Sequence, residues 1–165
     1  MKIKHFLLIT LFVSSSNIAL ASHSAGMDIR YECLSTNTYK VTLTFYRECS
    51  GISAPTGNWA SYSADTYLSV FSPSSGSTAN FSLTSITPFP VPVFPTISSS
   101  PSCPYTGSCT GGSTNQTQIH TYEGILTLPS VRSDWTVLAA ICCRNPGINT
   151  INGPGNYDIA VTAII

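Results

Sequence analysis

Apolar and polar residues alternate along much of the chain, and this period of two predicts half-buried β-strands. The clearest case is a hairpin formed by residues 28–33 and 39–46 around a turn at residues 35–38. One face of each strand is apolar: Ile29, Tyr31 and Cys33 on the first, and Tyr39, Val41, Leu43 and Phe45 on the second. Because the two faces match, we expect them to pack on the same core, with Cys33 pointing inward.

Similar patterns predict further strands at residues 66–71, 79–83, 118–128, 135–143 and 157–165. We expect residues 79–83 to pair back on residues 66–71 as a second hairpin. Two of the strands have well-defined faces, one with His120, Tyr122, Gly124 and Leu126 and the other with Trp135, Val137, Ala139, Ile141 and Cys143. The chain is therefore predicted to be all-β, an antiparallel β-sandwich of the Ig-like or jelly-roll-like kind.

Proline sets residues 84–117 apart from the strands on either side. The prolines that break the strand pattern are Pro88, Pro90, Pro92 and Pro95. Proline removes a backbone donor and holds the chain extended, which excludes a central strand. We expect an excursion that follows a sheet edge or takes a polyproline-like form, followed by a loop containing Cys103 and Cys109.

The first 21 residues have the composition of an export signal. Lys2 and Lys4 precede the apolar residues 6–13, and Ala19-Leu20-Ala21 supplies a small-x-small cleavage pattern. A membrane helix needs about 20 apolar residues, and this run is far shorter. We therefore predict a cleaved signal peptide at residues 1–21, a single domain at residues 22–165 with no transmembrane segment, and a secreted, extracellular or cell-surface location.

Charge is scarce and balanced. Only 8% of residues are charged, with seven Lys and Arg against seven Asp and Glu. This balance gives no electrostatic footprint for nucleic acid. It also leaves few groups for acid–base catalysis, and we expect no cofactor.

Six cysteines in an exported chain predict a disulfide-stabilised fold. They are Cys33, Cys49, Cys103, Cys109, Cys142 and Cys143. Cys33 and Cys143 both fall on inward faces, so we hypothesise a Cys33–Cys143 bridge across the core. Neighbouring residues of a strand point to opposite faces, so we expect Cys142 and Cys143 to have different partners. If Cys103 and Cys109 close a small local loop, Cys49 is left for Cys142, although the sequence alone does not choose among the 15 possible pairings. Zinc ligands favour a different spacing, so no metal site is expected.

Few other residues suggest chemistry. His120 and Glu123 lie three apart on one strand, so they should face opposite sides and form no acid–base pair. The segment 107–111 fits a thiol version of the nucleophile elbow, but a disulfide loop explains it better. Exposed aromatic residues offer a sugar-stacking platform, with core or loop packing as the alternative. These aromatic residues are Trp59, Tyr62 and Tyr105.

Four blocks, in this order, resemble a known module. They are His23-x-x-Gly26-x-x-Ile29-x-Tyr31-x-Cys33, residues 39–49 from Tyr39-Lys40-Val41-Thr42-Leu43 to Tyr46-Arg47-Glu48-Cys49, residues 122–129 ending in Leu126-Thr127-Leu128-Pro129, and Cys142-Cys143-Arg144-Asn145 followed by Ile148 and Ile151. Together they resemble the N-terminal β module of large secreted, gliding-motility-associated surface proteins of Bacteroidetes bacteria. The resemblance implies an extracellular module and brings no catalytic residues with it.

The function expected from these observations is a secreted or cell-surface structural or adhesive module without catalytic activity. Its expected partners are other extracellular β modules or surface glycans. A carbohydrate-binding module that uses exposed aromatic residues is the first alternative. A secreted enzyme is the second.

Overall fold

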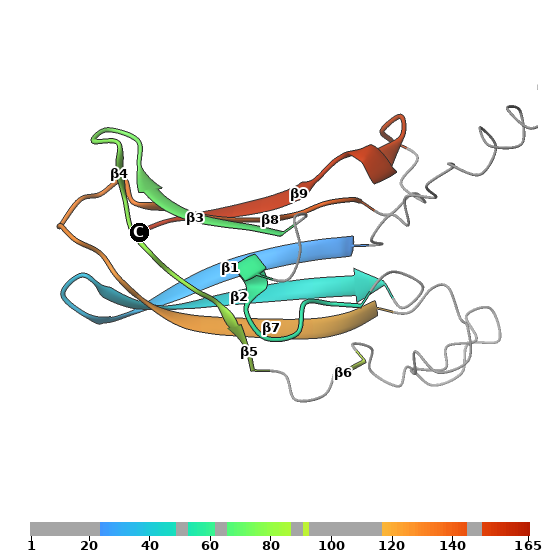
Figure 1. Cartoon of the computed structure of the whole chain (residues 1–165), viewed down its shortest axis with the longest axis horizontal. Coiled ribbons are helices and arrows are strands. Elements are labelled where there is room, and N and C mark those ends of the chain that lie inside the picture. The colour runs from blue at the N-terminus through green and yellow to red at the C-terminus, as the bar shows by residue number, and fades with distance from the viewer. Residues whose placement is uncertain (1–23, 49–52, 62–65, 87–90, 93–116, 145–149) are drawn as a thin grey trace, which may run out of the picture.

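Two antiparallel sheets make up the protein, and they lie one above the other around a shared core (Figure 1). The computed structural model describes residues 24–48, 53–61, 66–86, 91–92, 117–144 and 150–165. Sheet A has the strand order β1 (Ser24–Ser35), β2 (Thr38–Glu48), β7 (Thr117–Thr127) and β5 (Thr84–Ser85), with β6 (Val91–Pro92) also paired to β7. Sheet B has the order β4 (Ser77–Thr78), β3 (Thr66–Ser72), β8 (Thr136–Ile141) and β9 (Ile159–Ile164). The all-β prediction is confirmed.

The predicted hairpin is present as β1 and β2. Its turn is short, and Asn37 adopts a left-handed backbone with φ of 60°, a conformation that asparagine tolerates better than most residues. The backbone N–H of Leu128 donates to the carbonyl of Asn37 at 2.8 Å, which ties the turn to the end of β7. From Thr38↔Thr127 to Glu48↔Thr117, β2 then pairs with β7 without a register shift.

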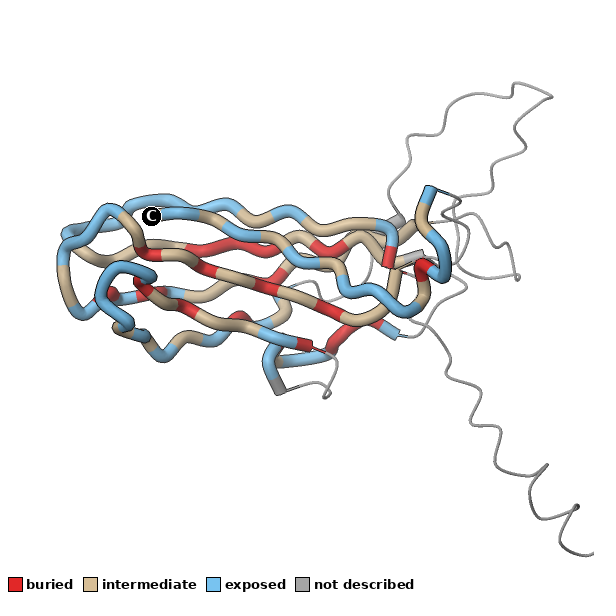
Figure 2. Tube along the Cα trace, turned by 90° about the horizontal axis from the view of Figure 1, so that it is seen from above, coloured by how far each residue is buried: buried red, intermediate tan, exposed pale blue. Residues whose placement is uncertain are grey.

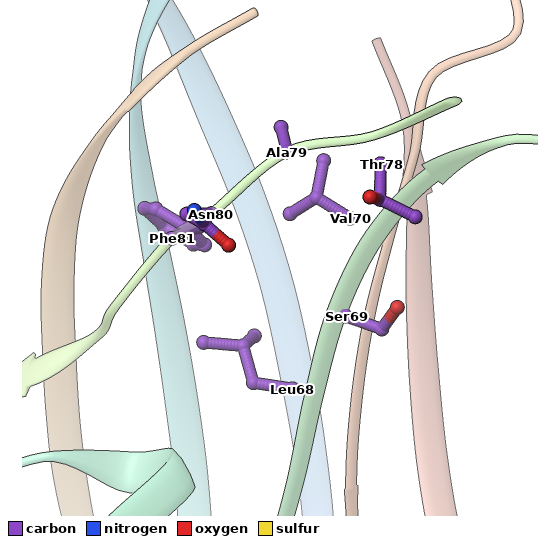
Figure 3. Close-up of a pocket in the computed structure, with 7 residues that line it drawn as sticks. All are labelled: Leu68, Ser69, Val70, Thr78, Ala79, Asn80 and Phe81. Atoms are coloured by element: carbon purple, nitrogen blue, oxygen red, sulfur yellow. The ribbon is translucent and has the colours of Figure 1, made fainter.

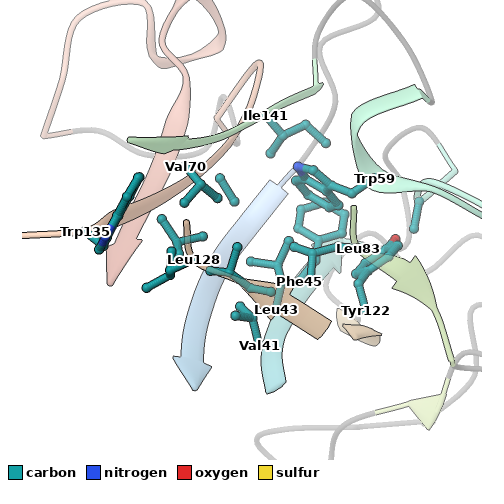
Figure 4. Packing of buried hydrophobic residues seen from close by; sticks show 14 residues of the cluster. Val41, Leu43, Phe45, Trp59, Val70, Leu83, Tyr122, Leu128, Trp135 and Ile141 are labelled. Atoms are coloured by element: carbon teal, nitrogen blue, oxygen red, sulfur yellow. The ribbon is translucent and has the colours of Figure 1, made fainter. Parts of the chain in front are cut away.

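Alternate residues of the long strands fill the core, as their sequence pattern predicts. Figure 2 shows these buried positions spaced along the strands. Sheet A contributes Val41, Leu43, Phe45, Tyr122 and Leu126, and sheet B contributes Val70, Val137, Ala139 and Ile141. Trp59 and Trp135, both fully buried, lie at opposite ends of this cluster (Figure 4). The predicted inward faces of β2, β7 and β8 are therefore confirmed.

Residues 79–83 do not form the expected second hairpin. Only Ser77–Thr78 pairs with β3, after which the chain crosses from sheet B to sheet A. The crossing segment runs from Ala79, whose N–H donates to Val70 at 3.0 Å, to Leu83, whose carbonyl accepts from Trp59 at 2.8 Å. It lies against Gly124, where a Cβ atom would overlap the Ser82 carbonyl oxygen. The glycine therefore makes room for the chain that links the sheets.

Part of the proline-containing excursion follows a sheet edge, as expected. Thr84 and Ser85 pair with Glu123 and Tyr122, and Val91 and Pro92 pair with Ile119 and Gln118, all along the same side of β7. Pro92 lies in an outermost strand, where a missing backbone donor costs least. Residues 87–90 and 93–116 lie outside the described residues.

Candidate interaction surface

The outer sides of β3, β8 and β9 in sheet B carry nine side chains and no charge. The register places them in three rows: Tyr67, Ala140 and Ala160; Ser69, Leu138 and Thr162; Phe71, Thr136 and Ile164. We call these nine residues the uncharged face. They project outward because their neighbours along each strand, such as Val70, Val137 and Ala139, point into the core.

Two large side chains stand out on the uncharged face. Tyr67 is 55% exposed and Ile164 is 65% exposed, on strands at opposite sides of the face. Ala140 and Ala160 lie beside Tyr67 in the same row, so the ring of Tyr67 stands above small neighbours. The backbone carbonyl of Tyr67 accepts a hydrogen bond from Trp59 Nε1 at 3.1 Å. The exposed tyrosine is therefore anchored to the core through its own main chain.

The outer side of sheet A is different in character. Its side chains include Asp28, Arg30, Glu32, Lys40 and Glu123, which we call the charged face. Lys40 Nζ lies 2.8 Å from Glu123 Oε1, and Thr42 Oγ1 donates to the same oxygen at 3.3 Å. A polar hollow of about 280 Å³ is lined by residues of this face, including Arg30, Glu32, Lys40 and Glu123. Within it, Lys40 and Thr42 both bond to Glu123.

A smaller groove opens where the chain leaves sheet B. Figure 3 shows it between β3 and residues Thr78–Phe81, with Leu68 and Val70 on one side and Asn80 and Phe81 on the other. Its volume is about 160 Å³. One wall is β3 and the other is the start of the segment that crosses between the sheets, so the groove is a consequence of that crossing.

Trp59 is not the exposed sugar platform that the sequence suggested, and the packing alternative is correct. Its side chain is fully buried. The ring meets Phe45 and Tyr122 edge-on, with centroid distances of 5.6 and 5.0 Å. Tyr122 in turn donates through its hydroxyl to Pro55 O at 2.8 Å. These contacts hold residues 53–61 against the core, as aromatic edge-to-face pairs generally do.

The other two aromatic candidates, Tyr62 and Tyr105, lie outside the described residues. The exposed aromatic residues that the sequence did not single out include Tyr67, Tyr157 and Tyr31, of which Tyr67 lies on the uncharged face. A signal for it was present, because Tyr67, Ser69 and Phe71 alternate with Leu68, Val70 and Ser72 in the predicted strand. The alternation alone does not show which of these two sets of side chains faces the core and which faces outward.

The predicted pairing of the cysteines is wrong at its central bridge. Cys142 and Cys143 are bonded to each other, and Cys33 is a free, exposed thiol whose Sγ lies 3.5 Å from Ser35 O. β1 runs beyond the cover of the opposite sheet, so every residue from Arg30 to Ser35 is exposed whichever way it points. β8 ends at Ile141, and Cys143 has φ of 124°, so it does not continue the inward face.

The Cys142–Cys143 bond also excludes the Cys49–Cys142 pairing. Cys49, Cys103 and Cys109 lie outside the described residues, and the Cys103–Cys109 pairing stays a prediction. Neighbouring strand residues do point apart, but here the strand has already ended. The disulfide found among the described residues joins two adjacent residues and does not connect the two sheets.

His120 and Glu123 lie on opposite faces of β7, as predicted, but His120 is not a simple surface residue. It is half-buried, and its ring centroid lies 6.5 Å from that of Phe45. Burial, followed by the positive charge of Arg47, lowers the pKa of His120 to about 4. Its Nε2 lies 3.4 Å from Gln118 Oε1, and Gln118 also accepts from Arg47 at 2.8 Å. His120 is therefore neutral at pH 7.

A serine-rich turn at the end of β3 holds the side chain of Asp134 by hydrogen bonds. Ser72 Oγ donates to both carboxylate oxygens of Asp134 at 2.9 Å, and the backbone N–H of Ser74 donates to Oδ2 at 2.9 Å. Hydrogen bonds from Ser74, through its side chain and then its backbone, lower the pKa of Asp134. No histidine is part of this cluster, and its geometry explains a fixed turn rather than a nucleophile.

Within the described part of the chain, no three His, Cys, Asp or Glu side chains are grouped to hold a metal ion. None of the described helices has the length and hydrophobicity needed to cross a membrane. Comparison with known protein families, curated proteins and solved structures gives no match for this chain.

Proposed function

We propose that this chain is a secreted or cell-surface β-sandwich module without catalytic activity, which contacts other extracellular β modules through the uncharged face. One observation carries the proposal: a sheet face with three rows of apolar, hydroxyl and aromatic side chains and no charge. The four-block resemblance to Bacteroidetes surface modules supports the same assignment.

The chemistry of interfaces favours this face over the charged one. Covering a charged side chain removes its water and costs several kcal/mol unless a partner charge replaces that water. Interface centres are accordingly poor in charged residues and rich in aromatic ones. The uncharged face can be covered without that cost, and Tyr67 supplies an aromatic anchor of the kind that dominates binding energy.

A binding comparison between two matched variants tests the proposal. Tyr67 on sheet B and Ile125 on sheet A are large apolar residues with similar exposure, 55% and 59%. The whole secreted chain would be labelled and its binding to the surface of source cells measured. We expect Tyr67→Lys to weaken binding at least about tenfold and Ile125→Lys to leave it unchanged.

Two results would contradict the proposal. One is equal binding by both variants, and the other is a loss of binding only with Ile125→Lys. Circular dichroism of each variant checks that the fold persists, which we expect because both positions are exposed. Binding that depends on Tyr67 but disappears when cell-surface protein is digested supports a protein partner.

A surface glycan is the second candidate, and the exposed ring of Tyr67 favours it. Small neighbours on one side of a tyrosine leave its ring open for stacking, as sugar binding requires. Binding that survives protein digestion and is removed by periodate oxidation of the cells would favour the glycan over the β module.

A further inference from the structure

Among the described residues, two edge strands lie on the same side of the molecule. β1 is the outermost strand of sheet A and β9 the outermost strand of sheet B, and the two are in contact. An outermost strand presents unpaired backbone donors and acceptors to any strand that approaches, and natural proteins usually protect such edges.

The edge of β1 is protected in two ways. Asp28, Arg30 and Glu32 place charges at three successive outward positions of β1. Its pairing with β2 also shifts register twice, between Ser24 and Gly26 and between Cys33 and Ser35. Charges and irregularities of this kind discourage pairing with another strand.

The edge of β9 has neither outward charges nor a register shift. Its sequence from Ile159 to Ile164 is Ile-Ala-Val-Thr-Ala-Ile, without charge or proline. All six residues pair with β8 in unbroken register, from Ile159↔Ile141 to Ile164↔Thr136. An uncharged, regular edge strand is a template for adding a further strand.

The direction of the backbone groups along β9 follows from one hydrogen bond. The N–H of Ile165 donates to Trp135 O at 2.8 Å, so residue 165 points its backbone toward the β8 side. Successive residues of an antiparallel strand direct their N–H and C=O groups to opposite sides. Ile159, Val161 and Ala163 therefore bond to β8, and Ala160, Thr162 and Ile164 turn their backbone groups to the free edge.

We infer that β9 pairs antiparallel with β9 of a second copy of this chain, about a two-fold axis at Thr162. This register sets Thr162 opposite Thr162 of the second copy and Ala160 opposite Ile164. All three residues with outward backbone groups then form hydrogen-bonded pairs, so no donor or acceptor of the edge is left over. The inference goes beyond the proposed function, because it concerns the edge of sheet B and not its face.

The side chains of the uncharged face also fit this register. The large Ile164 meets the small Ala160 on each side of the axis, and the two Thr162 side chains form a cross-strand pair of a favourable type. The absence of charge means that two identical strands meet without repulsion. The two copies of sheet B then form one continuous sheet, and their uncharged faces join into a single surface.

A cysteine placed on the axis tests the register directly. Opposite residues of a hydrogen-bonded antiparallel pair have Cα atoms about 5.5 Å apart, within the range that a disulfide spans. In the whole chain with Cys33→Ser, we expect Thr162→Cys to give a cross-linked dimer under mild oxidation. Peptide mapping must locate the bond at residue 162.

Ala160→Cys in the same background is the matched control. Its own copy lies four residues away along the strand, about 13 Å, so it should not cross-link. A 162–162 bond that forms while 160–160 does not supports the inference. Equal yields at both positions, or none at residue 162, would overturn it.

Sedimentation equilibrium on the whole chain adds a test without cysteine chemistry. We expect a dimer whose dissociation constant rises at least about tenfold in Thr162→Lys, because two like charges then meet at the axis. Ser69→Lys puts the same charge on the same face two strands away and should leave the dimer intact. A chain that is monomeric up to its solubility limit, or a dimer insensitive to Thr162→Lys, would refute self-pairing.

The outcomes separate this inference from the proposed function. A monomeric wild-type chain that still binds cells through Tyr67 refutes only the self-pairing. A dimer that does not bind cells supports the self-pairing and counts against the proposed contact function.

Discussion

Sheet A faces water with Asp28, Arg30, Glu32, Lys40 and Glu123, whereas the nine outward side chains of β3, β8 and β9 in sheet B include no charged group. Toward the core the two sheets are alike, since alternate apolar residues of the strands of each sheet belong to one cluster. Core formation therefore does not explain the contrast. Covering the charged face requires desolvation of its charged groups, whereas covering the uncharged face does not. Only the uncharged face therefore suits a contact surface.

The largest effects should come from the shared interior. Trp59→Ala removes a fully buried ring that contacts Phe45 and Tyr122, and we expect it to lower the free energy of unfolding by about 3–5 kcal/mol. Tyr67→Ala, an aromatic residue on the uncharged face, should change it by only about 0.5 kcal/mol. Urea denaturation measures both. Similar losses for the two variants would mean that the uncharged face is not a free surface.

The next largest effect concerns the chain that links the sheets. Gly124→Ala places a methyl group where the Ser82 carbonyl lies, with Phe81 also close. We expect a cost of about 1–3 kcal/mol, measured by the same denaturation. Gly76→Ala is the contrasting control: nothing lies within 4 Å of its Cβ position, and any cost there arises from its φ of +67°. A neutral Gly124→Ala would show that the crossing segment is not held against β7.

Each sheet also has its own acid-sensitive group. His120 in sheet A has its pKa lowered from 6.5 to about 4, so the stability of its neutral form is present above pH 6.5 and is lost as the pH falls toward 4. The pKa of Asp134, beside sheet B, is lowered from 3.8, so its contribution is present above 3.8 and is lost at still lower pH.

Melting temperatures measured from pH 8 to pH 2 would separate the two groups. We expect His120→Gln to remove the upper part of the acid-induced loss and Asp134→Asn to remove the lower part. An unchanged profile between pH 6.5 and 4 in His120→Gln would contradict the role assigned to this histidine.

The smallest expected effect is a salt-dependent change in stability on the outer face of sheet A that has no counterpart on sheet B. Glu123→Gln breaks the ion pair with Lys40. The side chain of Glu123 is 25% exposed and that of Lys40 is 37% exposed, so we expect the free energy of unfolding to fall by about 0.2–1 kcal/mol at low ionic strength. This cost should shrink as salt is added, because exposed ion pairs are screened. Ser69→Ala on sheet B should show no salt dependence. A salt-independent Glu123→Gln effect would mean that the pair acts through its hydrogen bonds alone.

Much of the fold is local and was predictable. Alternation identified β2, β7 and β8 with their inward faces, because a half-buried strand must repeat every second residue. The crossing at residues 79–83 was not predictable, since Ala-Asn-Phe-Ser-Leu reads equally well as a strand. In the structure this segment packs against Gly124 on a distant strand, and no local pattern carries that information.

The errors at the candidate site have the same cause. Cys33 continues the inward pattern of β1, but the pattern does not tell where the opposite sheet stops covering it. For Trp59 the sequence leaves a sugar platform and core or loop packing both open, and the structure selects packing because residues 53–61 fold onto the core. Alternation predicts which residues share a face. Which outer face is charged then follows from the sequence, but which face is open follows only from the tertiary arrangement.

The most direct test of the account is hydroxyl-radical footprinting of the whole chain, free and bound to source cells. The contact surface is predicted to be the uncharged face, so Tyr67 and Phe71 should become protected on binding. Tyr31 and Ile125, which are exposed on sheet A, should stay equally reactive in both states. Protection of Tyr31 and Ile125, with Tyr67 still reactive, would contradict the account.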